Sequence, residues 1–435
     1  MLTAFASAFR TPDLRRKLVF TLAMIALYRL GASIPTPNTN SQAINACIKS
    51  ASGTSQSTYA LINLFSGGAL LKLSVFALGI MPYITASIIV QLLVVVIPRF
   101  ETLKKEGQAG QQKLTQYSRY LTIGLAILQS AGFIALARSG QLFPGATDCH
   151  PLYKTGIFEL STMVIIMTAG TGVVMWLGEL ITDRGVGNGM SILMFTSIAA
   201  RIPNEGNTIL QTAGGFAFTL ILLLGLAIIA AVVFVEQAQR RIPVQYAKRM
   251  VGRRMYGGTS TYLPLKVNMA GVIPVIFASS LLYIPQLISQ LNGNSTSTLQ
   301  RWVTNHLINQ QDWIHITTYF LLILFFTYFY VGITFNPEER ADDMKKYGGF
   351  IPGIRPGRPT AEYLQYVLSR ITLPGGLYLG IIAVLPNFFF SITQGNNQNF
   401  PFGGTAVLIM VGVALDTVKQ IESQLMQRNY EGFLR

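Results

Sequence analysis

The sequence repeats one motif: Gly79-Ile-Met-Pro-Tyr-Ile-Thr-Ala-Ser87 returns as Gly271-Val-Ile-Pro-Val-Ile-Phe-Ala-Ser279. Gly, Pro, Ile, Ala and Ser recur in register, and each copy lies early in a long apolar segment without charged residues. A proline inside a membrane-spanning helix removes a backbone donor and bends the helix. The repeat therefore predicts the same kink twice, and it indicates a duplicated unit with two matching, specialised helices.

The composition is that of a protein with many membrane spans. Of the 435 residues, 51% are hydrophobic and only 12% are charged, whereas a soluble domain usually carries about 25% charged residues. There are ten charge-poor segments, most of which approach the roughly 20 residues that cross a bilayer, whereas the fifth and tenth are shorter. The predicted spans lie near 18–34, 73–97, 120–137, 157–177, 188–200, 213–235, 268–290, 314–335, 371–392 and 402–415. The first follows Arg15-Arg-Lys17 without a small-residue cleavage site, so we expect a retained span and not a signal peptide.

The basic residues indicate how the spans are oriented. If the N-terminus is inside, most of the 33 Lys and Arg residues fall in segments that face the cytoplasm. An excess of basic residues marks the cytoplasmic side of a membrane protein. We therefore expect both termini in the cytoplasm.

Ten spans divide into two halves of five, at about 1–205 and 206–435. Because five is odd, the second half enters the membrane in the opposite sense, and homology between the halves makes an inverted repeat. The repeated motif falls on the second span of each half. The fifth span of each half is short and follows glycines, in Gly185-Val-Gly-Asn-Gly189 and in Gly403-Gly404. Such a pair points to a central site, although close helix packing by small residues explains either one alone.

Two features belong to the predicted outer side. The segment 59–72, between the first two spans, is apolar but too short to cross the membrane. It is either an interfacial helix or a re-entrant plug inside a cavity. Cys47 and Cys149 have no CxxC context, so we expect two unpaired cysteines, with a disulfide between them as the alternative.

The sequence lacks the motifs of catalysis and of coupled transport. It contains no Walker A, HExxH or paired metal-ligand motif, so we expect no catalytic residue, cofactor or metal. The cores of spans two, three and five to ten hold no Asp, Glu, Lys or Arg, whereas ion-coupled carriers and proton pumps place ionisable groups there. Arg29, near the end of span one, is expected to snorkel to the interface. Any driving force must come from another protein.

Two large cytoplasmic loops are candidate docking surfaces. Residues 238–266 carry seven basic residues, no acidic ones and three tyrosines. This pattern suits ribosomal RNA or anionic lipid. The loop 336–370 mixes both charges and suits a protein partner better. Its turn-rich tip, Gly349-Phe-Ile-Pro-Gly-Ile-Arg-Pro-Gly357, presents Arg355 as a fixed contact point.

The whole chain resembles the SecY family, the channel subunits of the bacterial Sec protein translocon. The resemblance rests on many short strings in the family's order. These are Phe65-Ser-Gly-Gly-Ala69, Gly79-Ile-Met-Pro-Tyr-Ile84, Lys104-Lys-Glu-Gly107, Gln116-Tyr-Ser-Arg-Tyr120, Trp176-Leu-Gly-Glu179, Arg184-Gly-Val-Gly-Asn-Gly189, Tyr246-Ala-Lys-Arg249, Leu263-Pro-Leu-Lys-Val-Asn-Met-Ala-Gly-Val-Ile-Pro274 and Gly353-Ile-Arg-Pro-Gly357. Gln427-Arg-Asn-Tyr-Glu-Gly432 resembles the high-GC Gram-positive branch.

The resemblance implies an all-α polytopic membrane protein. Its ten transmembrane helices would form two inverted five-helix halves around a central pore, with a short plug helix within 59–72. Such a protein is a passive conduit for unfolded polypeptide, and it opens both across the membrane and sideways into lipid. An apolar pore ring would consist of Ile80, Ile84, Met190, Met194, Ile276 and Ile409. Its two methionines depart from the family's isoleucine-rich pattern, but methionine keeps the ring apolar and deformable.

The resemblance also assigns the plug, the lateral gate and the docking residues. The plug would contain Asn63, Leu64, Phe65, Ser66, Gly67 and Gly68. The lateral gate would contain Pro82, Ser87, Gln91, Pro274 and Ser279. Docking of the SecA ATPase and of the ribosome would use Arg240, Arg241, Lys248, Arg249, Arg253, Arg254 and Arg355. Further implied partners are SecE-like and SecG-like small membrane subunits, secretory and membrane protein substrates, and the lipid of the bacterial plasma membrane.

Two other classes of protein compete with this interpretation. A secondary transporter with inverted repeats shares the duplicated plan, but it should carry charges within the membrane. A membrane scaffold without a pore does not explain the paired prolines and the glycine-led short spans.

Overall fold

Each of the ten predicted spans overlaps a helix of the structure. The computed structural model describes residues 9, 11–50, 66–138, 151–246, 249–251, 254–256, 260–291, 302–303, 306–307, 312–393 and 404–431. The helices at the predicted spans are α2 (Pro12–Ser33), α5 (Met81–Val96), α7 (Gln108–Arg138), α8 (Ile157–Arg184), α9 (Gly189–Ala199), α10 (Ile202–Gln237), α11 (Ile273–Leu291), α13 (Trp313–Thr334), α15 (Arg358–Thr393) and α16 (Gly404–Glu431). Shorter helices are α3 (Ser41–Ser50), α6 (Pro98–Lys105) and α14 (Pro337–Lys346).

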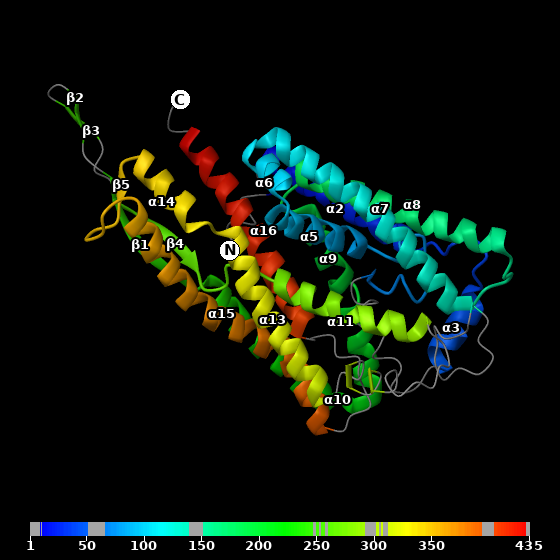
Figure 1. The fold of residues 1–435 in the computed structure, drawn as a ribbon. Coiled ribbons are helices and arrows are strands. Elements are labelled where there is room, and N and C mark those ends of the chain that lie inside the picture. The colour runs from blue at the N-terminus through cyan, green and yellow to red at the C-terminus, as the bar shows by residue number, and fades with distance from the viewer. Residues whose placement is uncertain are drawn as a thin grey trace.

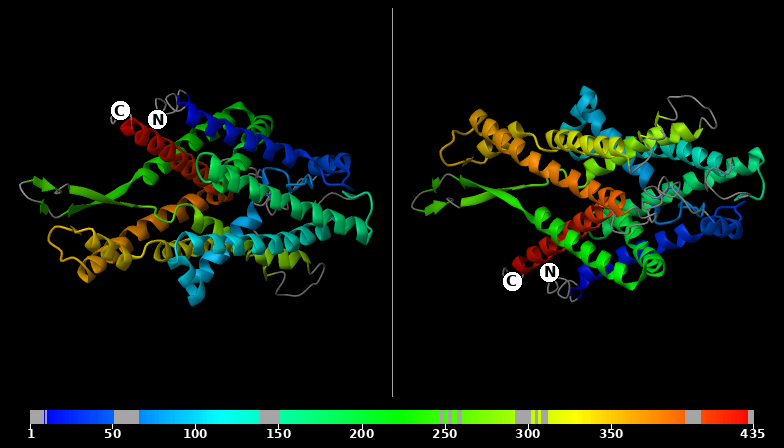
Figure 2. Two further views of the ribbon diagram at one scale, coloured as in Figure 1. Left: turned by 90° about the horizontal axis from the view of Figure 1, so that it is seen from above. Right: turned by 90° about the horizontal axis from the view of Figure 1, so that it is seen from below.

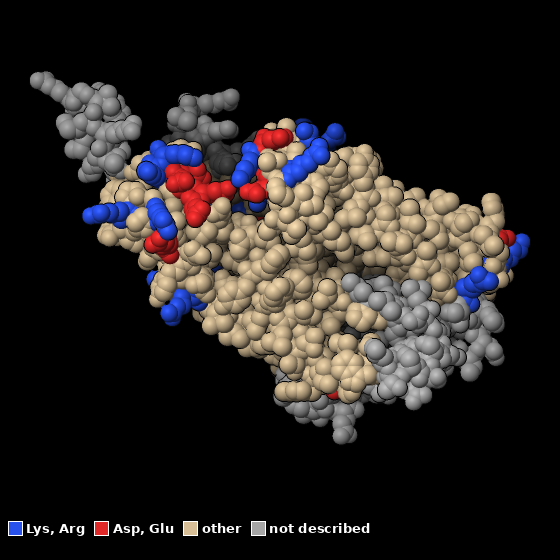
Figure 3. Space-filling model, viewed as in Figure 1, with Lys and Arg blue, Asp and Glu red and all other residues tan. Residues whose placement is uncertain are grey.

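Length and apolar surface make several of these helices suitable for a membrane. Within the described residues, five segments could each cross a bilayer, namely Gln108–Arg138, Ile157–Arg184, Trp313–Lys346, Arg358–Leu385 and Gly404–Met426. The pair α5 and α6, bent by 100° at its break, makes a sixth. By contrast, α9 has 11 residues and is too short to cross alone. On the face that Figure 3 shows, most charged residues gather along the upper left and at the right end, and the surface described between them is mostly uncharged.

The helices pack in two sets with the same order of neighbours (Figures 1 and 2). In the first set α5 packs on α7, α7 on α8, and α8 on α9; in the second α11 packs on α13, α13 on α15, and α15 on α16. The main contacts between the sets are α9 with α16, and α11 with α5 and α7. The start of α2 also packs near the end of α16 through Leu14, Val186 and Ile421. The two ends of the helical chain therefore lie on the same face.

A small β-sheet extends from this face. Strand β1 (Gln239–Tyr246) pairs antiparallel with β4 (Ser260–Lys266) and with β5 (Gly349–Phe350), in the order β4-β1-β5. Beyond it, β2 (Arg249–Val251) pairs with β3 (Arg254–Tyr256) as a projecting hairpin (Figure 1). The two loops predicted as docking surfaces, 238–266 and 336–370, thus share one sheet.

The local sequence explains how α14 is positioned beside this sheet. Asn336 caps the helix by accepting from Glu338 N, and Pro337 occupies the first turn. Acidic residues lie in the first turn and basic residues in the last turn, as the helix dipole favours.

The prediction of paired proline kinks was wrong. Pro82 is the second residue of α5, and Pro274 is the second residue of α11. At this position the missing proline N–H costs nothing, because the first N–H groups of a helix have no partner within it. Each motif glycine has a positive φ, +55° at Gly79 and +60° at Gly271, which glycine adopts readily. The motif therefore encodes a sharp turn followed by a helix start.

Three further expectations need correction. Residues 73–80, predicted as part of the second span, form turns that precede α5. The tenth helix is not short, because α16 runs from Gly404 to Glu431. Cys47, on α3, is disulfide-bonded and not unpaired; the chain has one other cysteine, Cys149, which lies outside the described residues.

Candidate functional site

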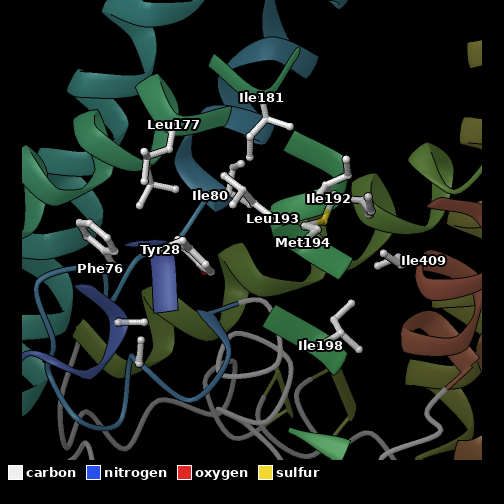
Figure 4. Close-up of a cluster of buried hydrophobic side chains, with 14 of the residues drawn as sticks. Tyr28, Phe76, Ile80, Leu177, Ile181, Ile192, Leu193, Met194, Ile198 and Ile409 are labelled. Carbon is white, nitrogen blue, oxygen red and sulfur yellow. The ribbon is translucent and has the colours of Figure 1, made fainter. Parts of the chain in front are cut away.

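One apolar cluster brings together all six residues of the predicted pore ring. Four of them are buried: Ile80, Met194, Ile276 and Ile409. The half-buried Ile84 and Met190 pack against them. Figure 4 shows Ile80 and Met194 near the centre of the cluster and Ile409 approaching from α16. Side chains distant in the sequence and from both sets of helices thus meet in one place.

The repeated motif positions three isoleucines of the ring, two from its first copy and one from its second. Gly79 turns the chain so that Ile80 is buried just before α5, and Ile84 follows one helical turn later. Gly271 makes the equivalent turn before α11, which presents Ile276. On α9, Met190 and Met194 are four residues apart and so share a helix face.

Glycines at the starts of α9 and α16 bring these helices close to their neighbours. A Cβ atom on Gly189 would overlap the carbonyl oxygen of Gly178 on α8, and one on Gly404 would overlap the carbonyl of Ile382 on α15. Helix α9 therefore packs on α8, and α16 on α15, through backbone contact. Close packing and contribution to the cluster occur together at both helices, so the two explanations offered for the paired glycines are not exclusive.

The described part of the predicted plug lies against this cluster. Ser66 is buried, and Gly67 and Gly68 have positive φ angles of +65° and +87°. Further along, Val75 N donates to Ile34 O over 2.9 Å and Thr36 N to Leu73 O over 3.0 Å, which fixes the segment to the end of α2. Asn63, Leu64 and Phe65, and with them most of the expected plug helix, lie outside the described residues.

Arg29 contacts the plug segment, a role that the sequence reasoning missed. Its Nη1 atom donates to the Gly67 carbonyl oxygen over 3.4 Å, and the same glycine lies against the backbone of Ser197 on α9. The neighbouring Tyr28 hydroxyl is 2.7 Å from Ser197 Oγ, and both side chains are buried. A lone arginine near the end of a charge-free span was the available signal, because ionisable residues in spans are rarely without function.

The predicted gate residues lie on two helices that touch, α5 and α11. Pro82, Pro274 and Ser279 are buried, whereas Ser87 is half-buried and Gln91 is exposed. Ser279 Oγ donates to Ile276 O of its own helix over 2.9 Å. On its other side, Phe277 of α11 stacks on Phe326 of α13 with ring centroids 5.1 Å apart, and α11 packs more extensively on α13 than on α5.

An ion pair stabilises the first set of helices beside α5. Arg119 on α7 donates from Nε and Nη2 to the two carboxylate oxygens of Glu179 on α8, over 2.9 and 2.8 Å. Both helices also pack on α5. A bidentate pair of this kind fixes geometry as well as charge. It therefore keeps α7 and α8 together as a rigid support for α5.

The predicted docking residues extend along the sheet and the loop beside it. Arg240 and Arg241 are exposed on β1. Arg355 is exposed in a turn whose Gly353 and Gly357 have φ angles of +84° and +105°, and Thr360 Oγ1 donates to Arg355 O over 2.8 Å. Arg249 and Arg254 lie on β2 and β3. Lys248 and Arg253 lie outside the described residues.

Residues 74–418 match the family model of SecY. The chain belongs to the SecY family. It is 65% identical to the protein translocase subunit SecY of Mycobacterium tuberculosis over 442 residues, and 65% identical to that of Streptomyces coelicolor over 440 residues. Both comparisons cover 100% of each chain. The predicted resemblance to high-GC Gram-positive members of the SecY family is confirmed.

Solved structures confirm the fold of this SecY-family chain. The structure described as that of a protein conducting channel has a TM-score of 0.62 at 18% identity, and it covers 94% of this chain and 91% of the other. Sec61 in the canine ribosome-channel complex from the endoplasmic reticulum has a TM-score of 0.58 at 17% identity, with the same coverage. The predicted fold class, an all-α polytopic membrane protein of the SecY type, is confirmed.

Proposed function

We propose that this SecY-family chain is the channel subunit of a protein translocase. It conducts unfolded polypeptide across the bacterial plasma membrane and releases apolar segments into the bilayer, with both termini in the cytoplasm. It has no catalytic activity of its own. The observation that carries the proposal is the meeting of Ile80, Ile84, Met190, Met194, Ile276 and Ile409 in one apolar cluster between two sets of helices.

An apolar ring suits a substrate of any sequence. A ring of charges would bind some polypeptide segments too strongly, whereas an apolar constriction binds none of them strongly and excludes water by dewetting. Removal of one isoleucine side chain from water contributes roughly 1.5–3 kcal/mol. The closed ring is therefore favoured when no substrate is present, and a chain in transit replaces those contacts with its own.

The plug and the gate provide the two ways of opening. In this proposal Ser66, Gly67 and Gly68 belong to a plug that leaves the pore during transport across the membrane. Separation of α5 from α11 opens the side of the channel to lipid. An apolar substrate segment leaves by this route because lipid solvates it better than a water-filled pore does.

The shared sheet provides the site for partners that supply energy. We assign the exposed Arg240, Arg241 and Arg355 to the docking of the SecA ATPase and the ribosome, together with Lys248, Arg249, Arg253 and Arg254. Arginine side chains on the projecting hairpin suit phosphate groups of RNA. The mixed charges of 336–370 suit a protein. SecE-like and SecG-like subunits would cover part of the apolar outer surface.

Cross-linking of a stalled secretory precursor tests the proposed function. The variants Ile84→Cys and Ile276→Cys should both cross-link to a precursor that carries a thiol-reactive probe. Ile165→Cys is the matched control, because Ile165, on α8, is 67% exposed and does not belong to the ring cluster. Cross-links at Ile165→Cys alone, or none at the two ring positions, would contradict a central conduit and would favour the transporter alternative.

A further inference from the structure

A buried carboxyl group lies at the end of α10 next to the sheet. Glu236 is only 9% exposed, and Asn268, 4% exposed, donates from Nδ2 to Glu236 Oε1 over 2.6 Å. Burial of a carboxyl group is unfavourable unless hydrogen bonds compensate for lost water. Neither residue belongs to the ring, the plug or the exposed docking surface, so their burial needs another explanation.

The Asn268 amide also contacts the turn that starts α11. The same Nδ2 atom donates to Gly271 O over 3.2 Å, and Gly271 is the motif glycine with φ +60°. One side chain therefore connects the end of α10 to the turn from which α11, two residues later, begins. Val267 N donates to Ala238 O over 3.0 Å, which continues the β1–β4 pairing up to Asn268.

Helix α15 closes the other side of this contact. A Cβ atom on Gly375 would overlap the carbonyl oxygen of Val267, so α15 packs directly on the segment. Two oxygen atoms here, Asn268 Oδ1 and the Tyr378 hydroxyl, are buried without a hydrogen-bond partner among the described residues. A buried polar cluster with incomplete hydrogen bonding is costly, so such clusters call for an explanation other than stability alone.

We propose that Glu236 and Asn268 are positioning residues that fix the start of α11 and thereby the width of the lateral gate. Their hydrogen bond, called here the α10–α11 clamp, holds the Gly271 turn in place. Because Ile276 and Ser279 lie in the first two turns of α11, ahead of Pro285, displacement at the start of the helix moves the gate contact with α5. This inference rests on the proposed function, in which α5 and α11 flank the lateral opening.

The hydrogen bond, and not the charge of Glu236, should be the essential element. Glu236→Gln keeps an acceptor oxygen for Asn268 and should keep the gate closed. Glu236→Leu and Asn268→Ala remove the bond and should displace α11. Loss of a hydrogen bond of ordinary strength corresponds to a rise of up to about tenfold in the population of the displaced gate. Lys266→Gln is the matched control, because it removes a nearby charge and its exposed ion pair with Asp416, 3.5 Å long, but leaves the hydrogen bond between Asn268 and Glu236 in place.

Spin-label distances across the gate test this inference. Labels on Gln91→Cys and Leu281→Cys, both exposed positions on α5 and α11, are measured by double electron–electron resonance in the full-length chain, purified with its small subunits into nanodiscs. We expect one narrow distance in the parent, in Glu236→Gln and in Lys266→Gln. We expect a second, longer distance in Glu236→Leu and Asn268→Ala. If Asn268→Ala does not fold, Asn268→Ser replaces it, because serine is too short to reach Glu236.

Two outcomes separate this inference from the proposed function. If the folded Glu236→Leu and Asn268 variants keep the narrow distance, the clamp only supports the fold and the inference is overturned, even though the parent still cross-links to precursor. If the parent never cross-links to a stalled precursor, the proposed function fails whatever the gate distances are.

Discussion

The two copies of the repeated motif start their helices in the same way but are held by different surroundings. Before α5, Gly79 follows an apolar segment of turns in which Leu70, Leu73 and Ala77 are fully buried. Before α11, Gly271 is held by the polar Asn268 side chain and, through it, by Glu236. The first copy continues from the proposed plug, and the second continues from the sheet that carries the proposed docking residues. We infer that the same turn geometry serves two purposes. At the first copy it helps to keep the resting channel closed, and at the second copy it allows α11 to respond to a bound partner.

The close glycine contacts should give the largest effects, and equal ones in both halves. Gly189→Val and Gly404→Val would force a side chain into a neighbouring backbone carbonyl, at a cost of about 3 kcal/mol or more. We expect both variants to lose folded protein, measured as monodisperse yield and thermal unfolding midpoint in detergent. Gly124→Val on α7 is the control, because nothing lies within 4 Å of its added Cβ. Tolerance of one variant but not the other would show that the halves are not packed equivalently.

Reversal of the charge of Arg355 should impair transport driven by a partner protein and leave the other properties of the channel unchanged. Arg355→Glu, in the exposed turn beside β5, should abolish most SecA-driven export while yield, thermal stability and resting ion leak stay unchanged. Arg358→Glu is the matched control, since its pairing with Glu362 is exposed and contributes little. Export assays in proteoliposomes measure both. Normal ATP-driven export by Arg355→Glu would remove the assigned role of this surface.

Truncation of the motif isoleucines should open the seal from either copy. Ile84→Gly and Ile276→Gly each remove apolar contacts worth roughly 1.5–3 kcal/mol, so we expect a several-fold rise in resting conductance for each and a larger rise for the double variant. Planar-bilayer recordings provide the measurement. Ile123→Gly, on the exposed face of α7, controls for helix destabilisation. Unchanged conductance in the double variant would mean that this cluster is packing alone.

Loss of the arginine contact at the plug side should give the smallest effect. Arg29→Met removes the hydrogen bond to Gly67 O, worth about 1 kcal/mol, and should raise resting conductance modestly without impairing SecA-driven export. Lys72→Gln, a nearby exposed cation, should behave like the parent. An export defect without any ion leak would mean that Arg29 acts in the response to a partner and not in closure of the channel. The proposed difference between the two copies of the motif would then be wrong.

The positions of the spans and of the ring could be predicted from the sequence, but the local form of the motif could not. Each of the ten predicted apolar runs overlaps a helix of the described residues, and the family resemblance assigned the six ring residues that the fold then brings together. The prolines were misread because a proline kinks a helix only when a turn of helix precedes it. Residues 73–80 are apolar enough to be helical. They form turns before α5 instead, because Gly79 has a positive φ and backbone hydrogen bonds hold the segment against the end of α2.

Contacts between remote polar groups were out of reach for sequence reasoning. The bond between Asn268 and Glu236, and that between Arg29 and Gly67, join residues whose proximity depends on how whole helices pack. The disulfide of Cys47 was missed for the same reason, because the local spacing of cysteines does not show which thiols come together in the fold. The end of α16 was misplaced because charges follow Asp416, although the helix continues as an amphipathic one and buries Ile421.

A translocating polypeptide should separate the two copies of the motif. In Ile84→Cys/Ile276→Cys, a short bifunctional thiol reagent should link α5 to α11 in the resting channel, because both side chains belong to one cluster. A stalled precursor should abolish that link. If the link formed equally well with the precursor in place, the polypeptide would not pass between the two copies, and the proposed conduit would be wrong.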